Sequence, residues 1–117
     1  MNSLDKKILS SLEKIVGLLS DRRCENVITL NVTGLSEISD CLIIASGTSQ
    51  RQLKAVGAEI IDSAKDFGIT LARKSEDIDG TWVVLDFIDI VVHLFEPNRR
   101  EYYDLEGLWS DAAVVSL

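Results

Sequence analysis

The sequence predicts one α/β (α+β) domain, residues 1-117, with helices packed on a mixed five-stranded sheet. Two long segments repeat apolar residues at three- and four-residue steps, as amphipathic helices do. Several shorter segments are rich in branched and aromatic residues, which favour strands. The predicted order is helix, two strands, helix, three strands and a short helix, which is typical of a mixed architecture. A length of 117 residues suits a single domain.

The first predicted helix begins near residue 4 and is followed by two strands. We expect Ser3 to be its N-cap. Its buried stripe consists of Leu4, Ile8, Leu12, Ile15 and Leu19. Residues 27–32, "VITLNV", alternate in and out and indicate a strand with one wet face. Residues 41–46, "CLIIAS", carry no charge, as expected for a central strand covered on both sides.

The second predicted helix begins after Ser49, which is a suitable N-cap, and ends at Gly68. Its apolar stripe consists of Leu53, Val56, Ile60, Ala64 and Phe67. A short strand over 69–73 and a polar loop over 74–80 follow. After Pro97, helical spacing returns through Tyr102, Leu105, Leu108 and Trp109, which predicts a short C-terminal helix.

Residues 82–95, "WVVLDFIDIVVHLF", predict a β-hairpin with a two-residue turn at Ile88 and Asp89. Strand alternation then separates two faces. The first face is apolar and should pack against the helices; it consists of Val83, Leu85, Phe87, Ile90, Val92 and Leu94. The second face is mixed and consists of Trp82, Val84, Asp86, Val91, His93 and Phe95.

The second face is too apolar for a solvent face and too polar for a core, because an unpaired buried carboxylate costs several kcal/mol. Two explanations fit it equally well. It is either a protein-binding surface with aromatic anchors, or it is covered by the C-terminal segment, with Trp109 or Tyr103 packed on Trp82.

Charge and composition exclude several classes of function. The net charge of −7 repels polyanions and favours a basic protein as partner over groove-type nucleic-acid binding. No apolar run approaches the roughly 18 residues that a membrane span needs. Cys24 and Cys41 lack a CxxC spacing, which favours the reducing cytoplasm. His93, the single histidine, has no cysteine or second histidine to complete a metal site, so we expect neither metal nor cofactor.

Two blocks resemble the signature of the ribosomal silencing factor family, also called the Iojap family. These are "DCLIIASGTSQRQLKAV" and "WVVLDFIDIVVHLFEPNRREYYDLEGLW", and the resemblance covers roughly residues 5 to 112. It implies a nucleotidyltransferase-like fold without nucleotidyl transfer. It also implies binding to ribosomal protein fourteen of the large subunit, which prevents joining of the small subunit and lowers translation when nutrients run short.

The resemblance places the binding determinants on Trp82, Leu85 and Asp86. We expect Trp82 to anchor the partner while Asp86 and Asp89 pair with its lysine or arginine side chains. The expected flanking residues are His93 and Phe95, and Arg100, Tyr103 and Glu106 are expected at the rim or in support of the sheet. Ribosomal RNA would be touched at most at the periphery.

The chain departs from the family at several positions. Ile88 stands where a glycine is common, and tight hairpin turns require a positive φ that branched residues disfavour, so a wider turn is the alternative to the two-residue turn. Asp77 also replaces a frequent glycine. Two alternatives to ribosome binding remain open: an enzyme that binds magnesium and a nucleotide through Asp86 and Asp89, and a homodimer that uses the second face.

Overall fold

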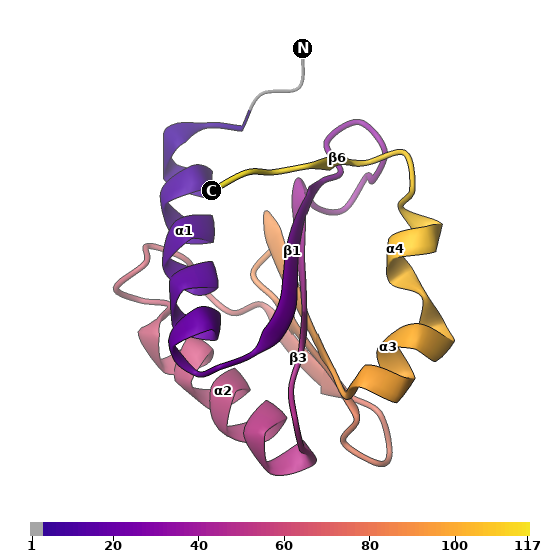
Figure 1. The fold of residues 1–117 in the computed structure, drawn as a ribbon. Helices are drawn as coiled ribbons and strands as arrows, with labels where there is room; N and C mark the ends of the chain where they lie inside the picture. The colour runs from indigo at the N-terminus through magenta and orange to yellow at the C-terminus, as the bar shows by residue number, and fades with distance from the viewer. Residues whose placement is uncertain (1–3) are drawn as a thin grey trace.

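The computed structural model describes residues 4–117 and shows a mixed sheet with helices on both sides (Figure 1). The elements are α1 (Lys6–Asp21), β1 (Glu25–Asn31), β2 (Cys41–Ser46), α2 (Gln50–Ser63), β3 (Arg73–Glu76), β4 (Trp82–Asp86), β5 (Ile90–Phe95), α3 (Pro97–Tyr103), α4 (Leu105–Leu108) and β6 (Ala113–Val114). The predicted mixed α/β class is confirmed.

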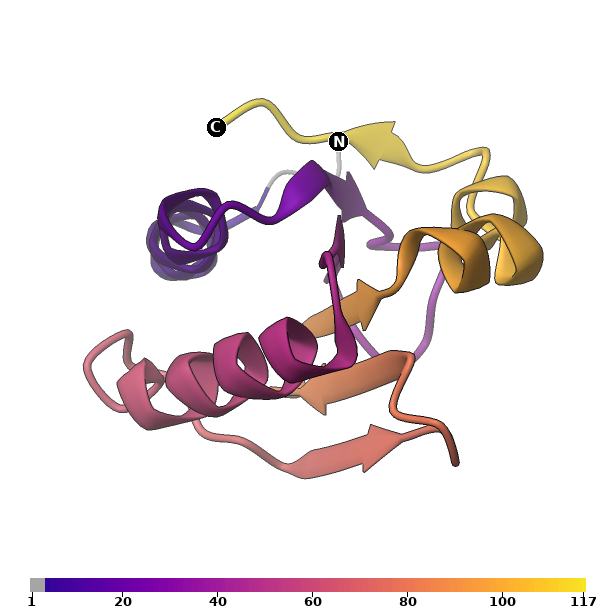
Figure 2. The ribbon, with the colours of Figure 1, turned by 60° about the horizontal axis from the view of Figure 1, so that its bottom comes forward.

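The strand order is β3-β4-β5-β2-β1-β6. Strands β2 and β5 are parallel, and every other neighbouring pair is antiparallel. The prediction of five strands is wrong, because β6 adds a sixth strand beside β1. Two residues are too few to show strand alternation in a sequence. Figure 2 shows β3 and β6 at opposite edges of the sheet.

Helices α1 and α2 cover one face of the sheet, and α3 and α4 lie on the other side (Figure 1). The main core fills the first of these interfaces with the predicted helix stripes and the apolar side of the hairpin. A smaller core lies on the opposite face, beneath the C-terminal segment. Within residues 4–117, no helix is long and apolar enough to cross a bilayer.

The helix caps explain where α1 and α2 begin. Ser49 Oγ accepts a hydrogen bond from Gln52 N at 3.1 Å, which confirms the predicted cap of α2. The N-cap of α1 is Asp5, whose Oδ1 accepts from Ile8 N at 2.8 Å. The cap predicted at Ser3 lies outside the described residues. Helix α2 ends at Ser63, and turns continue the chain to Gly68, which has a φ of 78°.

Two strands differ from their predicted bounds. β1 covers 25–31 instead of 27–32. β3 covers 73–76 instead of 69–73, so the two ranges share only Arg73. All four residues of β3 are exposed at the edge of the sheet, and an exposed strand leaves no hydrophobic alternation in the sequence. Main-chain pairing with β4 is what defines β3.

The predicted C-terminal helix is divided into α3 and α4 by Asp104. This residue has a left-handed conformation with a φ of 47° and a ψ of 56°, which ends α3. Asp104 Oδ1 then accepts from Gly107 N at 3.1 Å and caps α4. A Cβ at position 107 would lie 2.2 Å from Asp104 Oδ2, so the cap requires a glycine there.

Candidate functional site

The hairpin of β4 and β5 has the predicted register. Trp82 pairs with Phe95, and Asp86 pairs with Val91. Phe87 N donates to Ile90 O at 2.9 Å, so Ile88 and Asp89 form the turn. The predicted two-residue turn is therefore confirmed, and the wider alternative is not found. Ile88 adopts a φ of 74° instead, and Asp86 Oδ1 accepts from its main-chain nitrogen at 2.8 Å.

The first face of the hairpin packs against α1 and α2, as predicted. Leu85 belongs to this face and is 0% exposed. Although the family resemblance assigns Leu85 to the binding surface, its side chain has no surface that a partner can reach in this structure. Its packing fixes the strand that carries Trp82 and Asp86 on the other side.

The C-terminal segment covers only part of the second face. The covered part fits the explanation by intramolecular packing, and the rest fits the explanation by a protein-binding surface. Val91 and Phe95 are buried in the smaller core, against which Leu105 and Trp109 of the C-terminal segment pack. Phe95 is 0% exposed and therefore supports this face from beneath. Four residues of the face remain half-buried and form what we call the mixed face: Trp82, Val84, Asp86 and His93.

Trp82 is the centre of an aromatic cluster on the mixed face. Its ring centroid lies 5.0 Å from that of Phe95 in a stacked arrangement and 4.5 Å from that of Tyr103 in a tilted one. Tyr103, at the end of α3, is 40% exposed, and Trp82 itself is half-buried. Such offset aromatic contacts fix ring orientation while leaving apolar surface available to a partner.

His93 fixes the indole from the neighbouring strand. Trp82 Nε1 donates a hydrogen bond to His93 Nδ1 at 3.1 Å. Desolvation by burial lowers the pKa of His93 from 6.5 to about 4. The imidazole is therefore neutral at pH 7 and able to accept from the indole, as this geometry requires.

Acidic groups lie on one side of the aromatic cluster and farther along the hairpin. A hollow of about 250 Å³ lies beside the indole and is lined by Ser75, Glu76, Asp77, Trp82, Val84 and Tyr103. Asp86 lies on the mixed face, and Asp89 is exposed at the hairpin turn. An aromatic floor with carboxylates at its edge suits a lysine or arginine side chain, because the ring attracts the cation and the carboxylates neutralise it.

Arg100 and Glu106 link α3, α4 and β2 to one another. Arg100 Nε lies 3.2 Å from Glu106 Oε2, and Arg100 Nη1 donates to Ser46 Oγ at 2.9 Å. The Arg100 side chain is only 11% exposed, so this ion pair holds the C-terminal segment on the sheet. Glu106 Oε1 is buried and has no hydrogen-bond partner among residues 4–117. These contacts fit support of the sheet better than a place at a binding rim.

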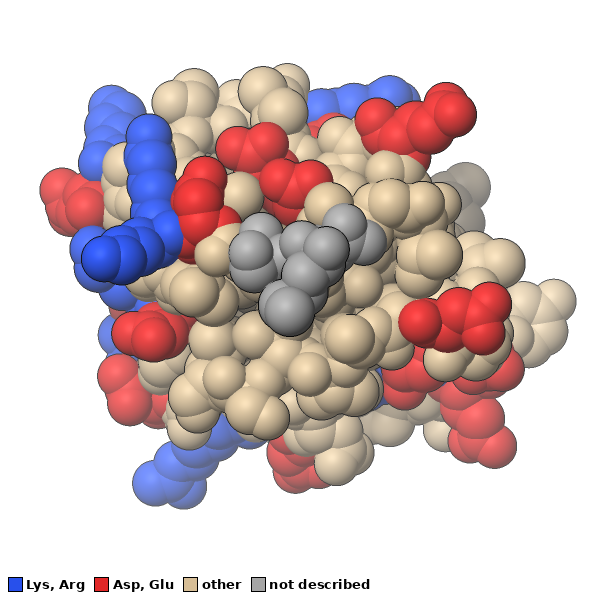
Figure 3. Space-filling view, turned by 90° about the horizontal axis from the view of Figure 1, so that it is seen from above, with Lys and Arg blue, Asp and Glu red and all other residues tan. Residues whose placement is uncertain are grey.

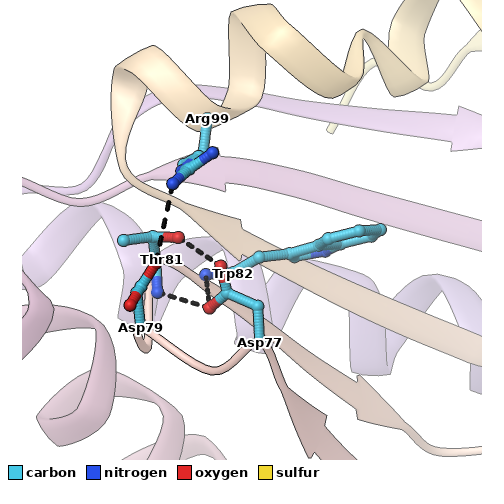
Figure 4. A network of polar contacts seen from close by, with 5 residues as sticks. All are labelled: Asp77, Asp79, Thr81, Trp82 and Arg99. Carbon is cyan, nitrogen blue, oxygen red and sulfur yellow. Dashed lines mark hydrogen bonds and ion pairs between the residues drawn. The ribbon is translucent and has the colours of Figure 1, made fainter.

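Asp77 is a residue of this site that the sequence did not single out for a role. Its carboxylate accepts hydrogen bonds from the main chain of Thr81 and Trp82 at the start of β4 (Figure 4). The signal in the sequence is an aspartate followed by a glycine and a threonine just before a strand, a pattern typical of a side-chain-capped turn. Among residues 4–117, no group of three or more His, Cys, Asp or Glu side chains is placed to hold a metal ion.

The charged side chains are unevenly distributed over the surface. Figure 3 views the molecule from above, and acidic side chains prevail at the edge on the side of α3 and α4. The sequence of this segment explains the excess: Glu101, Asp104, Glu106 and Asp111 outnumber Arg99 and Arg100. The segment that carries Tyr103 of the aromatic cluster is therefore acidic.

Comparisons with known proteins agree on one family. The model of the family described as "Ribosomal silencing factor during starvation" matches residues 5–117. A ribosomal silencing factor of Halalkalibacterium halodurans is 38% identical over 106 residues, which is 91% of each chain. A mouse protein named "Mitochondrial assembly of ribosomal large subunit protein 1" is 30% identical over 85% of this chain and 45% of its own.

The fold has a close counterpart among solved structures. A crystal structure of a Chromobacterium violaceum protein superposes with a TM-score of 0.82 and 31% identity, covering 88% of this chain and 86% of the other. Sequence and structure thus agree over nearly the whole length described here. The chain belongs to the ribosomal silencing factor family.

Proposed function

We propose that the protein binds the large ribosomal subunit through ribosomal protein fourteen and sterically prevents the small subunit from joining, which lowers translation. This function requires a docking surface and no catalysis, and its expected place of action is the cytoplasm. The observation that carries the proposal is the mixed face, where a half-buried indole on a rigid hairpin is bordered by carboxylates. The name of the mouse relative, which refers to the large ribosomal subunit, supports the choice of subunit.

The physical properties of the mixed face suit a basic protein. Trp82 supplies a large rigid apolar surface, the kind of residue that dominates binding energy at protein interfaces. Asp86 provides negative charge on the same face at the other end of β4, and Asp89 provides it at the hairpin turn. Because the whole chain carries −7, the partner surface should be positively charged, and contact with ribosomal RNA should stay at the rim.

The proposal predicts that the double substitution Trp82→Ala and Asp86→Ala strongly weakens binding without unfolding the protein. Loss of a central aromatic anchor costs 2 kcal/mol or more, or roughly thirtyfold in affinity. Co-sedimentation with purified large subunits measures the dissociation constant. Addition of small subunits then shows whether the wild-type protein lowers the yield of joined ribosomes.

Ile38→Ala is the matched control, because Ile38 is 78% exposed in the connection between β1 and β2 and is not part of the mixed face. It should bind and inhibit joining as the wild type does. Wild-type affinity in a folded double variant would show that the protein docks elsewhere.

A further inference from the structure

The loop between β3 and β4 contains a network of polar contacts centred on Asp77 (Figure 4). Asp77 Oδ1 accepts from Thr81 N at 2.6 Å and from Trp82 N at 3.0 Å. Asp77 Oδ2 accepts from the hydroxyl group of Thr81. The main-chain nitrogen of Asp77 also donates to Trp82 O at 3.0 Å. One residue therefore satisfies both main-chain polar groups of Trp82.

The indole of Trp82 is fixed separately, at its far end. In Figure 4 the ring points away from the Asp77 carboxylate. It reaches His93 on β5 through Nε1 and packs on Tyr103. Because the main chain is fixed by Asp77 and the ring by β5 and α3, the side chain spans two rigid supports. If the first is removed, the strand end that carries the indole is held only by its pairing with β5 and by the bond from Glu96 N to Thr81 O.

The same loop is joined to α3. Arg99 Nη2 lies 3.6 Å from Asp79 Oδ2, and Glu96 N, just before α3, donates to Thr81 O at 2.9 Å. Helix α3 ends at Tyr103, which packs against the indole. The loop and the helix thus hold the rings of Trp82 and Tyr103 in one arrangement.

The Asp77 carboxylate is charged at neutral pH. Desolvation opposes the charge, but the hydrogen bonds from Thr81 and Trp82 and the nearby Arg99 outweigh it and hold the pKa of Asp77 below its usual value. Its oxygens are therefore available as acceptors under physiological conditions. Hydrogen bonds to an ionised group are stronger than those between neutral groups.

We propose that Asp77 is a positioning residue for Trp82, which fixes the main chain at the start of β4 and so holds the indole in the orientation that binds the partner. The part of this inference that concerns the partner rests on the proposed function. The part that concerns the orientation of the indole does not. Asp77 acts through Trp82, so substitution of Asp77 should weaken binding more than the loss of one negative charge alone.

The first test observes the indole directly in the free protein. The chain has two tryptophans, so a ¹H–¹⁵N spectrum contains two Nε1–H signals, and Trp82→Phe identifies the signal of Trp82. Asp77→Ala should shift or broaden this signal, because the hydrogen bond to His93 is no longer held in one geometry. Asp77→Asn retains one carbonyl acceptor for the two main-chain N–H groups and should restore most of the signal.

The second test compares binding to large subunits. Asp77→Ala should weaken binding about tenfold and Asp77→Asn only two- to threefold, since the asparagine keeps part of the hydrogen bonding. Glu76→Gln is the matched control. Glu76 is also acidic and lines the same hollow, but among residues 4–117 the carboxylate that accepts hydrogen bonds from the main-chain nitrogens of Thr81 and Trp82 is that of Asp77. It should weaken binding by no more than Asp77→Asn does.

Several outcomes would overturn the proposal. An unchanged Trp82 signal in folded Asp77→Ala would show that the indole does not depend on Asp77. Equal loss of affinity in Asp77→Ala and Glu76→Gln would show that Asp77 acts only as a charge. If Asp77→Ala does not fold, the Trp82 indole signal is measured in Asp77→Asn and in Thr81→Val. Each variant should shift that signal, and an unchanged signal in both variants contradicts the role. If the wild type does not bind large subunits, the proposed function fails, and the indole signal alone decides the positioning role.

Discussion

The imidazole of His93 is the acceptor on which the indole of Trp82 depends. The bond from Trp82 Nε1 to His93 Nδ1 requires that Nδ1 carry no proton. Burial keeps the pKa of His93 near 4, so the imidazole remains neutral across the physiological range. A single buried titratable group thus stabilises the aromatic cluster without making it sensitive to pH near 7.

The depressed pKa of His93 predicts how stability depends on pH. The unfolded chain binds a proton at this residue near pH 6.5, whereas the folded chain does so only near pH 4. The unfolded state therefore binds more protons in this interval, and the free energy of unfolding falls as the pH is lowered through it. His93→Gln keeps an acceptor and removes the titration, so the fall should become shallower by up to about 1.4 kcal/mol per pH unit.

Urea unfolding between about pH 4.5 and pH 7 measures this slope. His93 is the only histidine, so no other imidazole contributes in the same interval. If the free energy of unfolding changes with pH equally in the wild type and in His93→Gln, the depressed pKa of His93 is contradicted.

Among the elements, the hairpin turn carries the most obvious strain. Ile88 has a φ of 74°, a conformation that costs a side-chain-bearing residue about 1–2 kcal/mol. Its side chain is 59% exposed, so little packing offsets this cost. The hydrogen bond from Ile88 N to Asp86 Oδ1 and the full register of β4 with β5 keep the turn tight. Pairing of the strands thus overrides the local preference of one residue.

We therefore predict that Ile88→Gly stabilises the protein by roughly 0.5–1 kcal/mol, because the relief of strain exceeds the entropy that glycine loses. The free energy of unfolding in urea measures the change. Ile78→Gly is the control: Ile78 is fully exposed and is not among the positive-φ residues, so this change should not stabilise the protein. A loss of stability in Ile88→Gly equal to that in the control would refute the prediction.

For the molecule as a whole, the net charge of −7 determines how encounter with a ribosome depends on salt. An acidic protein is attracted to a basic protein surface and repelled by RNA. Added salt screens both forces, within a Debye length of about 10 Å at 0.1 M. The sign of the salt effect therefore distinguishes the two kinds of docking surface.

We predict that the association rate constant with large subunits falls severalfold between about 0.05 M and 0.2 M salt, because steering toward a basic protein is screened. Stopped-flow measurement of labelled protein provides the rate. A rate that rises with salt would indicate that repulsion by ribosomal RNA dominates the encounter. Light scattering of the free protein at the same salt concentrations separates this effect from any homodimer that covers the mixed face.

Local patterns along the chain predict the mixed α/β class, the alternating faces of the hairpin strands and the hairpin register. Leu85 and Trp82 were assigned to opposite faces from strand periodicity alone, and the structure confirms that assignment. Ser49 was identified as a cap because side-chain capping is a local interaction. Such features depend on neighbours within a few residues, and a sequence displays them directly.

Features that depend on contacts between distant parts of the chain cannot be read from local patterns and are seen in the folded protein alone. β3 and β6 exist because main-chain groups pair across the sheet, and this pairing leaves no pattern in side chains. Phe95 was expected to flank the partner, yet Leu105 and Trp109 pack on the core that buries it. Whether a mixed strand face is open or covered depends on where the rest of the chain lies, and here the C-terminal segment covers one part and leaves Trp82 accessible.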